Sequence, residues 1–96
     1  MTEQSEKDFQ AEVIKVAKGN NWWSYHTFDS RRSEPGMIDL FMVKGIYLNL
    51  WELKTDTGKC TDAQATLLEA LEKVKVLNVA VKRPRDMDDI LRRLKR

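Results

Sequence analysis

The sequence is poor in the residues that build disulfide-linked, zinc-binding or membrane-spanning proteins. It holds one cysteine, Cys60, and one histidine, His26, among 96 residues. A single cysteine cannot form an internal disulfide, and its presence suits a reducing compartment. No apolar run approaches the ~20 residues of a transmembrane helix, and the polar, acidic start predicts no signal peptide. We therefore expect a cytoplasmic protein without membrane association.

The chain also lacks repeats, linkers and low-complexity segments, so residues 1–96 are predicted to form one domain with one modest core. The net charge of +2 is weak evidence for a nucleic-acid partner. Residues 82–96 are richer in charge, with seven basic and three acidic side chains. This end is either a solvated helix terminus or a surface that contacts phosphates.

Residues 35–54 contain two apolar runs that read as β-strands joined at Lys44-Gly45. Three charges interrupt them: Asp39, Glu52 and Lys54. If Lys44 and Gly45 form the loop, Val43 pairs with Ile46 and Asp39 lies opposite Leu50. Asp39 is then diagonal to Glu52 on the same face, at roughly 7–8 Å between backbones. A bulge of one residue would move Asp39 to the other face.

Two carboxylates this close repel each other unless a cation lies between them. Carboxylate oxygens without a cluster of histidine or cysteine favour Mg²⁺ or Mn²⁺ over zinc. Asp39 and Glu52 are thus the candidate metal ligands, with the backbone carbonyl of Leu53 as a third. Lys54 beside them would orient or deprotonate a water molecule and stabilise developing charge. The alternative is a purely structural ion pair between Lys54 and one of the carboxylates. A buried ion pair gives little stability over an apolar core.

The spacing Gly36-x-x-Asp39 followed by Glu52-x-Lys54 resembles the PD-(D/E)XK nuclease signature. The wider sequence resembles the virus-type replication-repair nuclease (VRR-NUC) family, in its compact standalone form from phages and prophages. Further segments carry this resemblance over nearly the whole chain: 5–10, 30–36, 52–55, Gly58, 61–64 and Arg83-Pro84. It implies an α/β fold of element order αβββαβ(α), with a mixed four-stranded sheet flanked by helices. If the protein is phage-encoded, its compartment is the bacterial host cytoplasm.

Helices are expected at residues 5–18, at 61–75 and near the C-terminus from about Asp86, where that residue or a neighbour provides the cap. Strands are expected at 22–28 and 76–81, the second of them buried. Gly19 is predicted to end the first helix in the left-handed conformation. The second helix is predicted to bury a stripe of four apolar side chains: Ala63, Leu67, Leu71 and Val74.

Two polar side chains have competing roles. Glu6 is either a first-turn acid favoured by the helix dipole or an active-site acid that binds the ion, directly or through water. The resemblance favours the second role for Glu6. Gln64 is either the partner of Thr61 in a capping box or a catalytic residue at the metal site. His26, alone on its strand, is expected to be packed or exposed rather than catalytic.

Arginine forks match phosphate geometry, so Arg31 and Arg32 in the polar loop before the Asp39 strand are expected to contact DNA. The same role is expected for three further basic residues: Lys59, Arg83, Arg85. Nothing in the sequence indicates reading of base edges, so recognition by DNA shape is expected.

The predicted function is that of a Mg²⁺-dependent endonuclease that cuts branched DNA, and in particular a homodimeric resolvase of four-way (Holliday) junctions. Two symmetric cuts require two sites, which a two-fold dimer supplies. Four aromatics, Trp22, Trp23, Tyr47 and Trp51, exceed what a small core readily buries and are the candidate interface. The alternatives are a nicking or flap-cleaving repair nuclease and a DNA-binding module without catalysis.

Overall fold

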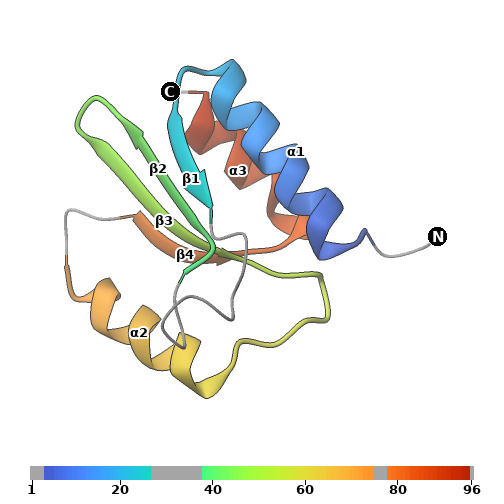
Figure 1. The fold of residues 1–96 in the computed structure, drawn as a ribbon, viewed down its shortest axis with the longest axis vertical. Coiled ribbons are helices and arrows are strands. Elements are labelled where there is room, and N and C mark those ends of the chain that lie inside the picture. Colours follow the sequence, from blue (N-terminus) through green and yellow to red (C-terminus); the bar gives the residue numbers. More distant parts are fainter. Residues whose placement is uncertain (1–3, 27–37, 75–77, 96) are drawn as a thin grey trace.

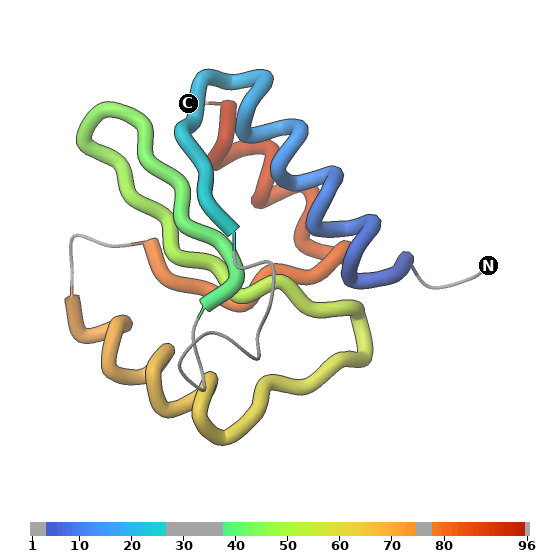
Figure 2. The backbone as a smooth tube through the Cα atoms, viewed as in Figure 1, coloured from blue at the N-terminus to red at the C-terminus, as the bar shows by residue number. Residues whose placement is uncertain are grey.

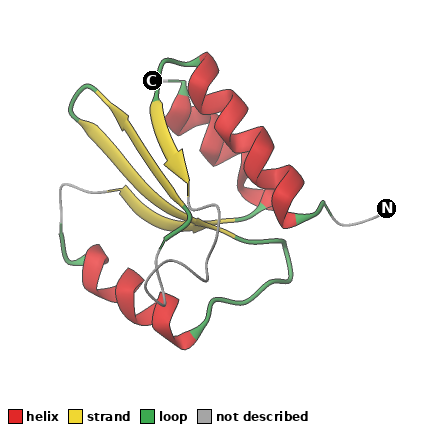
Figure 3. Ribbon diagram, in the orientation of Figure 1, coloured by secondary structure: helices red, strands yellow, loops and turns green. Residues whose placement is uncertain are grey.

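The fold is a four-stranded mixed sheet between two helical layers (Figures 1 and 3). The computed structural model describes residues 4–26, 38–74 and 78–95. The sheet order is β1-β2-β3-β4, with β1, β2 and β3 antiparallel and β4 parallel to β3. The strands are β1 (Trp23–His26), β2 (Leu40–Lys44), β3 (Tyr47–Leu53) and β4 (Asn78–Lys82). The helices are α1 (Glu6–Gly19), α2 (Asp62–Glu72), the 3-10 turn η1 (Pro84–Asp86) and α3 (Met87–Leu94). This order confirms the predicted αβββαβ(α) fold class.

Both faces of the sheet are apolar, and each is covered by helices from different parts of the chain. Helices α1 and α3 lie side by side on one face, and α2 lies on the other (Figure 1). The first face holds the larger core, in which Phe9 and Val13 of α1 and Ile90 of α3 pack on Trp51. Because side chains alternate along β3, Leu50 points the other way and packs against Leu68 of α2. No helix among the described residues is long and apolar enough to cross a membrane.

Helix α1 begins and ends at residues whose side chains and backbones satisfy its terminal groups. The Ser5 hydroxyl accepts a hydrogen bond from the Asp8 backbone N–H at 3.1 Å, so Ser5 is the N-cap of the helix. The other end differs from the prediction, because Gly19 is still helical. The left-handed residue is Asn21, with a φ of 67°. Asparagine tolerates this conformation better than most residues do, so the turn forms two residues later than expected.

The β2–β3 hairpin is shifted by two residues from the predicted register. Lys44 pairs with Tyr47, so the two-residue loop is Gly45-Ile46, and Gly45 takes a φ of 59°. Glycine adopts this conformation without the steric cost other residues bear. A shift of two residues preserves the face of every side chain, so Asp39 and Glu52 still share a face. It also brings them closer, because the last pair of the ladder, Leu40–Trp51, directly adjoins them.

Three other predictions are corrected by the structure. Strand β4 is an edge strand whose residues are all half-buried, rather than a buried strand. Of the stripe predicted for the second helix, Ala63 is exposed, and Val74 is exposed and lies beyond the end of α2. The unpredicted Leu68 is buried, and the apolar residues of α2 that pack on the sheet are Leu67, Leu68 and Leu71. The Asp86 carboxylate receives the Arg83 backbone N–H at 2.9 Å and makes no capping bond to α3.

The four aromatics predicted to form one interface do not do so. Trp22 and Trp51 are core residues, 3% and 0% exposed, and each indole N–H donates a 2.7 Å hydrogen bond, to the Leu94 carbonyl and the Asn78 side chain respectively. Trp23 is exposed. Tyr47 lies on the opposite face, where its ring contacts the Arg93 guanidinium. Hydrogen bonding of a buried indole explains why this small core accommodates two tryptophans.

Candidate active site

The candidate site lies at the end of the β2–β3 hairpin, where the chain of β3 leaves the sheet toward α2 (Figure 2). Asp39 Oδ2 accepts a hydrogen bond from the Leu53 backbone N–H at 3.0 Å. This bond fixes the Asp39 carboxylate beside Glu52. In an extended strand, the N–H and C=O of one residue point to the same neighbouring strand. The Leu53 carbonyl therefore lies on the Asp39 side of β3.

Glu52 is fully buried, yet only one of its carboxylate oxygens has partners. Oε2 lies 3.3 Å from Lys54 Nζ and accepts a 3.1 Å hydrogen bond from Gln64 Nε2. Oε1 is also buried and makes no hydrogen bond among the described residues. A buried carboxylate oxygen without a partner costs free energy and requires an explanation. A cation bound between the carboxylates would satisfy this oxygen.

The surroundings of Glu52 disfavour its charged form. Burial is the largest cause, and the neighbouring Asp39 adds to it. Together they raise the pKa of Glu52 from 4.5 to about 8, although Lys54 acts in the opposite direction. Near neutral pH and without a cation, Glu52 thus holds a proton much of the time. A divalent ion must displace that proton in order to bind.

Glu6 completes a cluster of three carboxylates. One oxygen each from Glu6, Asp39 and Glu52 lie within 4.8 Å of one another. Glu6 is exposed and belongs to the first turn of α1, which lies beside the carboxyl end of β3 (Figures 1 and 2). Oxygen ligands of an octahedral Mg²⁺ ion are about 3 Å apart when adjacent and about 4 Å apart when opposite, since each Mg–O distance is about 2.1 Å. The three residues therefore fit one such ion after an inward movement, or with a water molecule bridging from Glu6.

The Gln64 amide hydrogen-bonds both to the cap of α2 and to Glu52. Its Oε1 accepts the Thr61 backbone N–H at 2.9 Å, and Thr61 Oγ1 accepts the Gln64 N–H at 3.1 Å, which completes a capping box. Its Nε2 points the other way and donates to Glu52. The expectation that the two roles compete for one amide is wrong, because they use opposite ends of it. The start of α2 is thereby tied to the candidate metal site.

Arg83 was expected to contact DNA, and in the structure its side chain hydrogen-bonds to backbone carbonyls of the protein. Its Nη1 donates to the carbonyls of Thr55 and Gly58, both at 2.6 Å. The Gly58 N–H in turn donates to Thr55 Oγ1 at 2.9 Å, and a Cβ on Gly58 would meet that oxygen at the same distance. Arg83 thus closes the loop that directly follows Lys54, a role that the Arg83-Pro84 dipeptide does not reveal.

Of the other residues expected to bind DNA, the structure describes some and not others. Lys59 and Arg85 are exposed, and the Arg85 backbone N–H donates to Asp56 at 3.1 Å. Arg31 and Arg32 lie outside the described residues. His26 is half-buried at the end of β1, as expected for a packed residue.

Comparison with known proteins was made on sequence and on structure. No family model and no curated protein matches the sequence. The structure is similar to that of a solved "VRR_NUC domain protein", with a TM-score of 0.74 at 19% identity, covering 98% of this chain and 88% of the other. The chain has the VRR-NUC domain fold. The resemblance read from short motifs is thereby confirmed at the level of the fold. In the structure of this chain, Asp39, Glu52 and Lys54 lie together at the open end of the β2–β3 hairpin.

Proposed function

We propose that this protein is a metal-dependent endonuclease that hydrolyses phosphodiester bonds in DNA. The observation that carries the proposal is the cluster of Glu6, Asp39 and Glu52 around a buried, unpartnered carboxylate oxygen, with Lys54 alongside. The VRR-NUC fold, named for a nuclease domain, supports the same activity. Asp39, Glu52 and the Leu53 carbonyl are the proposed ligands of Mg²⁺ or Mn²⁺, with Glu6 binding directly or through water. The ion would polarise the phosphate and lower the pKa of a bound water.

The side chains of the chain have separate tasks in this proposal. The Leu53 N–H holds Asp39 in place, and Gln64 Nε2 holds Glu52. Lys54 Nζ, only 13% exposed at the side chain, is within reach of the attacking water and of the phosphate oxygens. It orients that water and stabilises negative charge as it develops. Arg83 positions Lys54 by closing the loop after it.

The test compares the chain with its Asp39→Asn and Glu52→Gln variants on a panel of labelled DNA, with Mg²⁺ or with chelator. Both variants should bind DNA and fail to cut it, because the ion acts mainly on the transition state. Calorimetry should show Mg²⁺ binding to the unchanged chain and its loss in each variant. Comparable cleavage by either variant would contradict the metal assignment, and binding without cleavage by the unchanged chain would indicate a DNA-binding module.

We further propose that the protein is a homodimer that resolves four-way junctions. The support is a group of apolar side chains on β1 and β2, on the face of the sheet on which α2 lies. Trp23 and Tyr25 are 64% and 53% exposed there, opposite Val43 and Phe41 on β2. The four side chains line a shallow cavity of about 300 Å³. Such an aromatic patch is typical of protein interfaces, and it replaces the interface predicted from the sequence.

A junction assay separates this proposal from the alternative of a flap or nicking nuclease. With Mg²⁺, the dimer should cut four-way junctions at paired, symmetric positions in preference to linear duplex. Preferred cutting of flaps or nicks would identify the alternative. Sedimentation at micromolar concentration gives the oligomeric state independently of cleavage, so the two parts of the proposal fail separately.

A further inference from the structure

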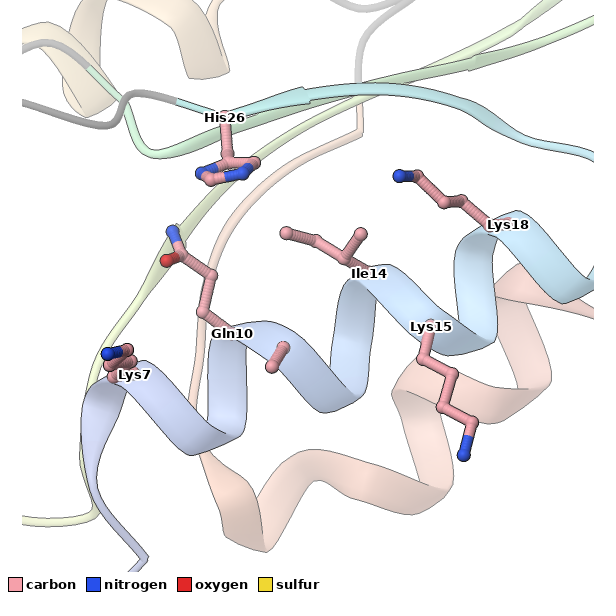
Figure 4. Close-up of a pocket in the computed structure, with 7 residues that line it drawn as sticks. Lys7, Gln10, Ile14, Lys15, Lys18 and His26 are labelled. Carbon is pink, nitrogen blue, oxygen red and sulfur yellow. The ribbon is translucent and has the colours of Figure 1, made fainter.

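A cavity lies between α1 and the end of β1, and the proposed chemistry does not use it. Its volume is about 710 Å³. One wall is a stripe of α1 that runs from Lys7 through Gln10 and Ile14 to Lys18, and the opposite wall is His26. Figure 4 shows the His26 ring facing the Gln10 amide, with Ile14 directed into the space between them. His26 has further interactions within the protein, so it forms a fixed wall.

The α1 wall of this pocket is continuous with Glu6 of the carboxylate cluster, whereas His26 points to the opposite face of the sheet from Asp39. Gln10 lies one helical turn after Glu6, about 6 Å along α1 and on the same face. His26 pairs across the sheet with Leu40, the residue that follows Asp39. A ligand in the pocket would therefore lie beside the site proposed to cut the phosphodiester bond.

The chemistry of the lining is that of a nucleotide site. Lys7 and Lys18 stand at its two ends, and none of the described residues that line it is a carboxylate. Lysine at both ends of a groove favours phosphate. Between the lysines, Ala11 and Ile14 provide an apolar surface, and the Gln10 amide and His26 imidazole provide hydrogen-bonding groups. An apolar wall with a few polar groups suits a flat heterocyclic base.

We propose that this pocket binds unpaired nucleotides of a DNA strand next to the cleavage site, a proposal that rests on the nuclease function. Paired DNA presents only its phosphates and groove edges, so it would leave the wall formed by Ala11 and Ile14 uncovered. An unpaired nucleotide presents a base face and a phosphate together. Lys7 and Lys18 are eleven residues apart, which is about 16 Å on a helix, so the stripe spans no more than about five nucleotide steps of 3.4 Å. Unpaired nucleotides occur at the branch points and single-stranded arms of branched DNA.

The experiment measures binding in chelator, where no cleavage occurs, by the anisotropy of a fluorescent single-stranded oligonucleotide and of a duplex of equal length. Ala11→Phe places a ring in the pocket without touching the core, because Ala11 is exposed on α1. It should weaken single-strand binding at least tenfold and leave duplex binding within about twofold. The matched control is Ala70→Phe on the exposed side of α2, which should change neither.

A second pair of variants tests the phosphate contacts. The double substitution Lys7→Ala with Lys18→Ala should lower the salt dependence of single-strand binding by a slope of about 1.4, at about 0.7 for each phosphate contact. Lys73→Ala with Lys95→Ala removes the same charge from exposed positions elsewhere and should leave the slope unchanged. Circular dichroism checks that each variant is folded. An equal change in both lysine pairs would mean that only net charge matters and would overturn the proposal.

Two further outcomes would also overturn it. Equal loss of duplex and single-strand binding in Ala11→Phe would make the pocket a general DNA surface. Tighter binding of thymidine monophosphate than of the oligonucleotide would make it a site for a free nucleotide. Cleavage of DNA by the unchanged chain with Mg²⁺ is measured separately. Absence of cleavage in the unchanged chain would contradict the nuclease function, while the binding result in chelator would still decide the pocket.

Discussion

Glu52→Gln should make the ion-free protein more stable while abolishing its proposed activity. The folded-state pKa of Glu52 is about 8, against 4.5 for an unperturbed glutamate. Since the folded protein binds this proton more tightly than the unfolded chain does, the contribution of Glu52 to stability is complete below pH 4.5. It is lost progressively as the pH rises from 4.5 through 8. Glutamine carries no charge at any pH, and its amide can donate to Asp39, so the variant should lack this loss.

The magnitude follows from the shift of the pKa. Each unit corresponds to about 1.36 kcal/mol, so the full shift would be about 5 kcal/mol, reached above pH 9. At pH 7 the loss would be about 3 kcal/mol, and at pH 5 about 1 kcal/mol. A domain of this size is typically stable by about 5–15 kcal/mol, so the effect is large enough to measure easily.

The assay is urea unfolding at pH 5, 7 and 9 in the presence of chelator. The variant should gain stability over the unchanged chain by an amount that grows with pH. Excess Mg²⁺ should narrow the difference between the two chains, because an ion that binds only the folded chain adds about 2.7 kcal/mol at a hundredfold excess over its Kd. Glu69→Gln, which alters an exposed carboxylate on α2, is the control and should show no such dependence. A difference between Glu52→Gln and the unchanged chain that does not vary with pH would refute the reasoning.

Four further predictions concern the groups around Glu52 and the exposed sheet face. Lys54→Ala should lose most cleavage while calorimetry still detects Mg²⁺ binding; loss of the ion would instead give Lys54 a structural role. Arg83→Ala removes two hydrogen bonds to loop carbonyls and should lower the free energy of unfolding by about 2–3 kcal/mol. An unchanged free energy in urea unfolding would mean that Arg83 contacts DNA rather than stabilising the loop. Gln64→Ala and Thr61→Ala should each lower the free energy of unfolding by about 1 kcal/mol, because each removes part of the cap of α2. Only Gln64→Ala should weaken Mg²⁺ binding. Equal weakening by both would mean that Gln64 acts only as a capping residue. Trp23→Lys should convert the proposed dimer to a monomer by sedimentation, and an unchanged dimer would place the interface elsewhere.

The face on which each side chain lies was determined by the sequence alone. Alternation along a strand puts Asp39 and Glu52 together for any hairpin register that differs by an even number of residues. The prediction therefore survived a two-residue error in the pairing register, since both registers preserve parity. The cap of α1 at Ser5 was equally local, because it depends on one hydroxyl and a backbone N–H three residues away.

Tertiary structure decided everything that depended on contacts between distant segments. The sequence contains no signal that Gln64 uses one end of its amide for a cap and the other for Glu52, since that depends on how α2 meets the sheet. The part of Arg83 in closing the loop after Lys54 depends on the parallel pairing of β4 with β3. Glu52 Oε1 lacks a hydrogen-bond partner among the described residues because packing shields it from water. Strand periodicity fixes which side chains can meet, and packing fixes how deeply they are buried and which atoms remain for a ligand.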